Sequence, residues 1–192
     1  MAKCILKKDG SYFCDEFSPE NPEPMILYMI LSLSLYFIYW IYKINVKIEK
    51  ILDSCPDSKR CFAILFVIPL SWATIYLLLK KFIFFEYFQP LEIANYVMWS
   101  IIVFLSLQYI YEFCIAFGKI TTTNGLVWYL FLYPGYFAII LFFLNFYYTL
   151  PLIFFPIITI PAMQASLNKK ANLCYVKKQE LYFNQDLYKG NS

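Results

Sequence analysis

Polar side chains within long apolar stretches are the groups of this sequence best suited to chemistry. Gln108, Asn145 and Gln164 stand in uncharged runs, and Glu112 directly follows one of these runs. Polar residues at membrane depth line the paths of channels and transporters. In the alternative interpretation, which we favour, the amides join one helix to another by hydrogen bonds, and Glu112 is a carboxylate at a membrane boundary.

The chain's six cysteines are the second candidates for chemistry. Cys4 and Cys14 flank the pair Asp9-Gly10, which is a hairpin-turn signal. If the N-terminus lies outside the cell, these two cysteines can form a disulfide, whereas cysteines on the cytosolic side stay reduced. No two cysteines have the CxxC spacing of a zinc or redox site, so the sequence predicts no metal site.

Other catalytic signatures are missing. The sequence contains no histidine, and its 5 glycines form neither a GxGxxG nor a GxxxxGK[ST] pattern. Histidine is the usual ligand of zinc enzymes and the usual base of serine hydrolases. A net charge of +3 is small for a nucleic-acid binder, which must neutralise phosphates. We therefore predict no catalytic, cofactor-binding or metal-binding residue, no cofactor and no nucleic-acid partner.

The composition points to the elements that must position the polar groups. Of 192 residues, 61% are hydrophobic and only 15% are charged, and the mean hydropathy is +0.57. A soluble domain is about 45–50% apolar and about 25% charged. The sequence therefore predicts an all-α fold, a polytopic bundle of transmembrane helices.

Five apolar stretches fit this prediction. They cover residues 25–42, 61–79, 93–117, 126–147 and 150–165, between a polar N-terminal segment of residues 1–24 and a polar tail of residues 169–192. The last two come from one uncharged run, which as a single helix would be about 73 Å long. Because a hydrocarbon core is about 30 Å thick, we prefer five spans. Four spans, with a re-entrant or broken segment at the end, are the alternative.

Basic residues predict the orientation. In the five-span arrangement, eleven of the 16 Lys and Arg residues lie on the side of the C-terminal tail, and five lie on the other side. Basic segments flanking the spans remain in the cytosol. We therefore expect the N-terminus outside and the C-terminus inside, in a plasma membrane or an organelle inner membrane. With four spans the two termini share one side.

The end of the first expected span carries a membrane-interface pattern. Aromatic side chains and lysines follow one another there, namely Tyr39, Trp40, Tyr42, Lys43, Lys47 and Lys50. Tyrosine and tryptophan favour the membrane interface, and the lysines recur on one stripe beside isoleucines at helical spacing. We expect an amphipathic helix on the cytosolic membrane surface. A plain extension of the helix into solvent is the alternative.

Two short motifs resemble a known group. The segment from Tyr36 to Lys43 resembles the aromatic helix end, Tyr-x-x-Tyr-Trp-x-Tyr-Lys, of small bacterial membrane proteins classed only as a domain of unknown function. Gln164-Ala-Ser-Leu-Asn168 is similar to the Gln-x-x-Leu-Asn that closes the last helix of that group. The resemblance implies a multi-spanning architecture and brings no activity. The group's Gly-rich helix segments are missing in this chain.

Three functions compete. The leading hypothesis is a non-enzymatic integral membrane protein that acts as a structural or accessory subunit, with lipid and other membrane subunits or a second copy of itself as partners. A small channel or transporter with an uncharged polar path is the alternative. The third is a lipid-acting membrane enzyme that uses Glu112 or a cysteine.

Overall fold

The computed structural model of the chain is built from helices. It describes Cys14, Phe17 and residues 19–32, 36–52, 56–82, 88–143 and 154–189. These residues contain α-helices and one π-helical turn, and no strand. The all-α class expected from the composition is therefore confirmed. The hairpin expected around Asp9-Gly10 lies outside the described residues.

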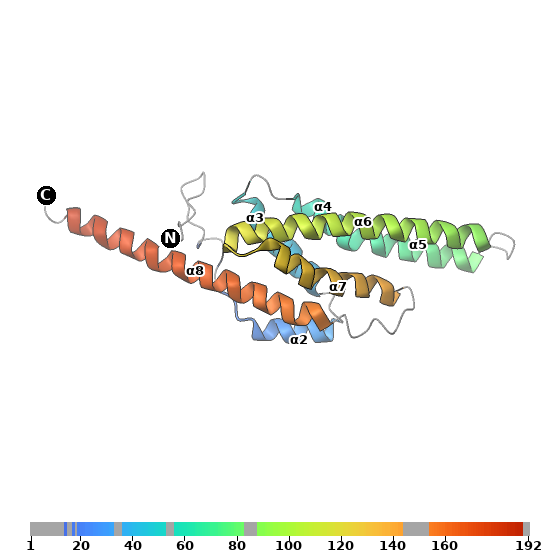
Figure 1. The fold of residues 1–192 in the computed structure, drawn as a ribbon, viewed down its shortest axis with the longest axis horizontal. Helices are drawn as coiled ribbons and strands as arrows, with labels where there is room; N and C mark the ends of the chain where they lie inside the picture. Colours follow the sequence, from blue (N-terminus) through green and yellow to red (C-terminus); the bar gives the residue numbers. More distant parts are fainter. Residues whose placement is uncertain are drawn as a thin grey trace.

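Most of the helices run along the long axis of the molecule (Figure 1). In chain order they are α2 (Glu23–Leu31), α3 (Tyr36–Glu49), α4 (Ser58–Phe62), the π-helical turn η1 (Ala63–Val67), α5 (Ile68–Phe82), α6 (Phe88–Thr121), α7 (Gly125–Phe143) and α8 (Phe154–Lys189).

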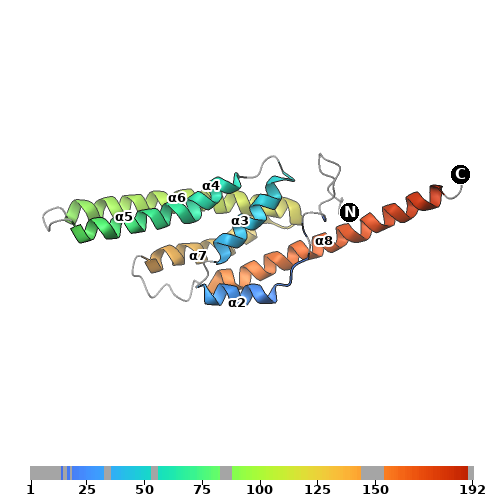
Figure 2. The same cartoon turned by 180° about the vertical axis from the view of Figure 1, so that it is seen from behind.

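Two helical stretches of the described residues are long and apolar enough to cross a membrane. They are Ser58–Phe82, which comprises α4, η1 and α5, and Gln89–Thr121 within α6. They lie side by side, and at the end where they are joined they project beyond the other helices (Figures 1 and 2). No residue of α5 is buried, so this helix presents its apolar side chains outward, whereas α6 buries part of its apolar surface against the other helices.

Local chemistry explains where the first of these stretches begins and where it deforms. The carboxylate of Asp57 accepts hydrogen bonds from the backbone N–H groups of Lys59 and Arg60 at the start of α4. Further on, Pro69 lacks an N–H group, and its ring would collide with the carbonyl of the preceding turn. The wider π-helical turn η1 lies directly before it and interrupts the regular α-helix there.

The first expected span differs from the expectation. Pro24 lies in the first turn of α2, but α2 ends at Leu31 and α3 begins at Tyr36, so the expected span of residues 25–42 is not one helix. The Ser32 hydroxyl donates to the carbonyl of Tyr28 at 2.6 Å and accepts from the N–H of Tyr36 at 3.0 Å. One serine thus satisfies a backbone group of each helix.

Close backbone contact determines how α6 meets α7. A Cβ atom on Gly118 would lie 2.6 Å from the backbone nitrogen of Gly125, and one on Gly125 would lie 2.5 Å from the carbonyl oxygen of Cys114. Between the helices Thr122 adopts a φ of 59°, in the left-handed region that is costly for a branched residue. The two glycines therefore allow a turn too tight for any side chain.

Of the last two helices, α7 begins close to its expected position, and α8 differs from the expected span. α7 continues through Pro134 without a break, and Gly135 packs against the ring of Pro156 in α8. The Tyr133-to-Tyr136 segment is thus a packing site. α8 continues to Lys189, so most of the expected polar tail is helical and extends beyond the bundle (Figure 1).

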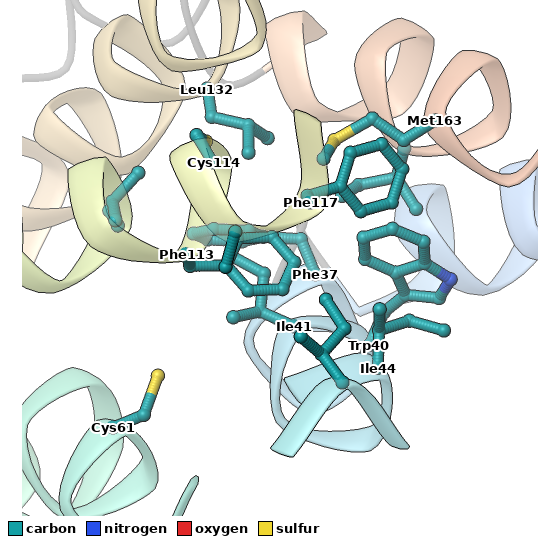
Figure 3. Packing of buried hydrophobic residues seen from close by; sticks show 14 of the residues in the cluster. Phe37, Trp40, Ile41, Ile44, Cys61, Phe113, Cys114, Phe117, Leu132 and Met163 are labelled. Atoms are coloured by element: carbon teal, nitrogen blue, oxygen red, sulfur yellow. The ribbon is translucent and has the colours of Figure 1, made fainter. Parts of the chain in front are cut away.

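The buried core lies where α3, α6, α7 and α8 meet. Side chains from the four helices converge there (Figure 3), including Phe37, Trp40, Phe113, Phe117, Leu132 and Met163. The ring of Trp40 packs edge-on against Phe113, with their centroids 6.3 Å apart. This aromatic core forms one side of the candidate site.

Candidate functional site

A network of polar side chains connects the N-terminal segment, α3 and α8. We call it the polar junction, and its members are Glu20, Trp40, Lys43, Lys47, Gln164 and Asn168. These residues lie up to 148 positions apart in the sequence. It is the most extensive polar network in the described part of the chain, and we take it as the candidate site.

The buried half of the junction is a relay of amide hydrogen bonds. The indole N–H of Trp40 donates to Oε1 of Gln164 at 3.1 Å, and Nε2 of Gln164 donates to Oδ1 of Asn168 at 2.9 Å. Both Trp40 and Gln164 are at most 2% exposed. A buried indole N–H needs a hydrogen-bond acceptor. The side-chain oxygen of Gln164 is this acceptor, and its side-chain nitrogen extends the network to Asn168, one turn later.

Asn168 holds the backbone of the N-terminal segment. Its Nδ2 donates to the carbonyl oxygen of Glu20 at 2.6 Å, and its Oδ1 accepts from the N–H of Glu20 at 3.1 Å. The side-chain amide thus pairs with both polar groups of one residue, as a neighbouring strand would. This contact fixes the chain just before α2 against α8.

The solvent-facing half of the junction is an ion pair. The Glu20 carboxylate lies 2.8 Å from Nζ of Lys43 and 3.5 Å from Nζ of Lys47. Partial burial alone would raise the pKa of Glu20, but the hydrogen bond and charge of Lys43, together with Lys47, outweigh it and hold that pKa below its ordinary value. Partial burial would lower the pKa of Lys43, but the bond to Glu20 and its charge raise it. Both groups are therefore charged at neutral pH.

The chemistry of the junction is that of a structural lock. Its side chains bond to other members of the junction, and no buried side-chain nitrogen or oxygen of the described residues lacks a hydrogen-bond partner. Satisfied polar networks rigidify a core and fix one arrangement of its elements. Nor do three His, Cys, Asp or Glu side chains gather as a metal-ligand set anywhere in the part of the chain that is described.

A groove of about 490 Å³ lies beside the junction. Its lining residues are Ala165, Asn168, Lys169, Asn172, Leu173 and Val176. The lining residues within the described part of the chain all belong to α8.

The residues expected at the membrane interface have separate environments. Tyr39 is exposed, but Trp40 is fully buried in the core, because its indole N–H pairs with Gln164. Tyr42 packs against Phe62 with ring centroids 5.1 Å apart. Of the three lysines, Lys43 and Lys47 bind Glu20, and Lys50 is exposed directly after α3. Ile44 and Ile48 of the expected amphipathic helix face the core.

The two described amides expected along a path, Gln108 and Gln164, do not form one group. Gln108 is exposed on α6 and donates to the carboxylate of Glu112 at 3.1 Å, while Gln164 belongs to the junction on α8. Asn145 lies outside the described residues. The described hydrogen bonds therefore connect Gln108 and Gln164 to different partners.

The cysteines give one unexpected proximity. The Sγ atoms of Cys14 and Cys174 lie 3.2 Å apart, and both residues are buried. Cys4 lies outside the described residues, so a Cys4–Cys14 disulfide stays a prediction. After the bonds between Glu20 and Asn168, this is the second contact that places the N-terminal segment beside α8.

Sequence reasoning missed Glu20 and the pairing of Trp40 with Gln164. The two motifs that carry these residues, at the end of α3 and within α8, are 124 positions apart, and neither contains a signal for the other. Two further bonds connect helices: Trp72 donates to Asn95 at 3.1 Å at a partly buried position, and Tyr136 donates to Ser106 at 2.7 Å in the core.

In its described part the chain is all-helical, and two of its helical stretches are long and apolar enough to cross a membrane. The polar junction connects the segment before α2 with α3 and α8. No protein-family model matches the chain, and neither a curated protein nor a solved structure matches it.

Proposed function

We propose that the chain is a multi-pass integral membrane protein that serves as a structural or accessory subunit of a membrane assembly, without enzymatic activity of its own. The observation that carries this proposal is the uncovered apolar surface of the α5–α6 hairpin. Its exposed large side chains include Leu70, Leu77, Phe82, Ile93, Val97 and Phe104. A monomer in water rarely exposes so large an apolar surface.

The length of that surface matches a bilayer. On the first helix of the hairpin, the uncharged stretch lies between Arg60 and Lys80, and on the second it lies between Glu92 and Glu112. Each pair is 20 positions apart, which is about 30 Å along a helix. The hydrocarbon core of a bilayer is also about 30 Å thick. Charged groups therefore mark both ends of an apolar band on two neighbouring helices.

The outer surface of the helices supports assembly with another protein. Gln108 and Glu112 form a hydrogen-bonded polar pair that faces outward at one end of the apolar band. Lipid acyl chains solvate such a polar pair poorly. Nearby, Tyr129, Tyr133 and Phe137 stack along half-exposed positions of α7 with successive ring centroids 5.9 Å apart. Aromatic residues are enriched at protein interfaces.

The junction supports a structural role. Its polar groups are engaged with one another, which leaves no activated nucleophile or base there. The channel hypothesis requires Gln108, Asn145 and Gln164 to face one cavity, and the separate partners of Gln108 and Gln164 do not favour it. The resemblance to the bacterial family of unknown function remains a proposal, supported by the contact between its two motifs at Trp40 and Gln164.

Extraction and native purification test the proposal. We expect the full chain to stay in the membrane fraction after alkaline carbonate, and to elute in mild detergent as a species much larger than its 22.9 kDa mass plus detergent. Mass spectrometry of that species is expected to find either a partner or several copies of the chain. Release by carbonate would contradict membrane integration, and a monodisperse monomer with no partner would contradict the subunit role.

A further inference from the structure

The chain folds back on itself between Glu20 and Lys43. A continuous helix across this interval would separate the two backbones by about 34 Å, yet the carboxylate of Glu20 lies 2.8 Å from the Lys43 ammonium group. The first of the two helices between them, α2, has 9 residues, which is about 13 Å of helix. Such a helix reaches less than halfway through a hydrocarbon core of about 30 Å.

The facing ends of the two helices are joined by hydrogen bonds of a kind that a membrane interior favours. Backbone groups in lipid must be satisfied by the protein itself. Ser32 meets part of this need, since its N–H and its hydroxyl both donate to the carbonyl of Tyr28 and its hydroxyl accepts from the N–H of Tyr36. The rings of Tyr28 and Tyr36 also pack with centroids 5.4 Å apart. These described contacts at the end of α2 and the start of α3 are compatible with a position inside the bilayer.

The far end of the chain returns to the same place. Asn168 of α8 binds both backbone groups of Glu20, and Cys174, about a turn and a half further on, lies beside Cys14. The first residues after the apolar part of α8 therefore lie on the same face as the residues that precede α2. An odd number of crossings between Glu20 and Asn168 would put them on opposite faces.

From these contacts we infer that α2 and α3 form a re-entrant hairpin that enters and leaves the membrane from the cytosolic face, and that the chain crosses the membrane four times, through Ser58–Phe82, α6, α7 and α8. This inference rests on the proposed membrane function. It replaces the expectation of an external N-terminus, because both chain ends then lie in the cytosol.

The distribution of charge agrees with this topology. With four crossings after the hairpin, 14 of the 16 basic residues fall on the side of the junction, and only Lys80 and Lys81 fall on the other. The five-span arrangement divides the same residues eleven to five. Since Lys and Arg of short loops collect on the cytosolic side, the re-entrant arrangement accounts for the charges better, and the junction lies at the cytosolic surface.

The topology assigns a partner to the outer face of α2. This face exposes Leu27, Tyr28, Ile30 and Leu31, and in the re-entrant arrangement it meets the acyl chains of the cytosolic leaflet alone. The paired charges of Glu20 and Lys43 then lie at the level of the lipid headgroups. A hairpin of this kind occupies the cytosolic leaflet and does not enter the other leaflet.

Accessibility of single cysteines in sealed membranes tests the inference. The variants are Asn21→Cys before α2, Lys50→Cys after α3 and Lys81→Cys at the far end of α5, each in a chain whose native cysteines are replaced by serine. A membrane-impermeant maleimide is added to intact cells and, separately, to permeabilised cells. We expect Lys81→Cys to be labelled in intact cells, and Asn21→Cys and Lys50→Cys to be labelled only after permeabilisation.

Each other result has a defined meaning. Labelling of Asn21→Cys in intact cells with Lys50→Cys protected would overturn the re-entrant hairpin while leaving the membrane function in place. Release of the chain by alkaline carbonate would contradict the membrane function itself. If the cysteine-free chain fails to fold, green fluorescent protein fused to either end of the native chain replaces this assay, because it fluoresces only in the cytosol. Both fusions are expected to fluoresce, and a dark N-terminal fusion would overturn the inference.

Discussion

The indole N–H of Trp40 donates a hydrogen bond to the side-chain oxygen of Gln164 at 3.1 Å, across 124 positions of sequence. The bond is buried and joins α3 to α8. Through Asn168 the same network holds the backbone of Glu20, so the segment before α2 and the middle of α8 are fastened to each other at one point. Substitutions that break this network are therefore expected to destabilise the fold.

Replacing Gln164 with leucine is expected to destabilise the fold. The change leaves the N–H of Trp40 without its acceptor in a buried environment and removes the hydrogen bond donated to Asn168. An unsatisfied buried donor costs about 1–3 kcal/mol, and we expect Gln164→Leu to lower the free energy of unfolding in detergent by that amount. Trp40→Phe, which leaves Gln164 unsatisfied instead, is expected to act in the same direction.

Gln108→Leu is the matched control for this substitution. Gln108 is also an α-helical glutamine, but it has one side-chain partner where Gln164 has two, and it is exposed on α6. Exposed substitutions usually change stability by less than about 0.5 kcal/mol. If Gln164→Leu were no more destabilising than Gln108→Leu, the junction would not stabilise the fold.

The Glu20–Lys43 ion pair predicts a dependence on pH. Since the folded pKa of Glu20 is lowered, its stabilisation is complete above the unfolded pKa of about 4.3 and is lost as the pH falls through the folded value. The raised pKa of Lys43 acts at the other limit: its contribution is complete below about 10.4 and is lost as the pH rises through the folded value. Between these limits we expect a plateau.

Comparison with Glu20→Gln isolates this effect from the other carboxylates. The variant keeps the backbone bonds to Asn168 but removes the charge. We expect it to be less stable than the native chain at neutral pH by at most about 1 kcal/mol, since the pair is partly exposed, and the difference is expected to vanish in acid. A difference that persisted unchanged below the folded pKa would contradict the pairing. Thermal unfolding at a series of pH values measures it.

Gly125→Ala is expected to disturb the α6–α7 turn. The added methyl group would lie 2.5 Å from the carbonyl oxygen of Cys114, a backbone atom that cannot rotate away. Overpacking of this kind costs about 1–3 kcal/mol. The change in the unfolding midpoint in detergent measures it.

Thr122→Gly in the same turn is the matched control, with the opposite sign. Thr122 has a φ of 59°, which a glycine adopts without the roughly 1–2 kcal/mol penalty of a residue with a side chain. The gain is partly offset by the greater freedom of glycine in the unfolded chain, so we expect a neutral or slightly stabilising effect. Strong destabilisation by Thr122→Gly, or none by Gly125→Ala, would contradict the described geometry.

The sequence was sufficient to predict the helices with long uncharged runs. α6 and α7 appear near their expected positions because no charged residue interrupts the run between Glu92 and Glu112 or between Gly125 and Phe143. The helical class also follows from composition alone. These features depend on neighbours in the sequence, which a hydropathy pattern records.

Features that depend on distant contacts were not predictable. Ser32 looks like any small polar residue in an apolar run, and only its bonds to both helix ends reveal the bend between α2 and α3. Trp40 was interpreted as an interface residue because the sequence does not reveal that Gln164 lies opposite it. The polarity of the residues after Lys169 predicts a tail, because polarity alone says nothing of their helix propensity.

Disulfide trapping between the two ends of the helical region tests the central claim most directly. Glu20→Cys and Asn168→Cys, introduced together into the cysteine-free chain in native membranes, are expected to form an intramolecular disulfide on mild oxidation, detected as a shift in gel mobility that reductant reverses. Glu20→Cys combined with Lys81→Cys is expected to form none. If the first pair failed to link in a chain that is inserted in the membrane, the two ends would not meet at one face, and the account would be contradicted.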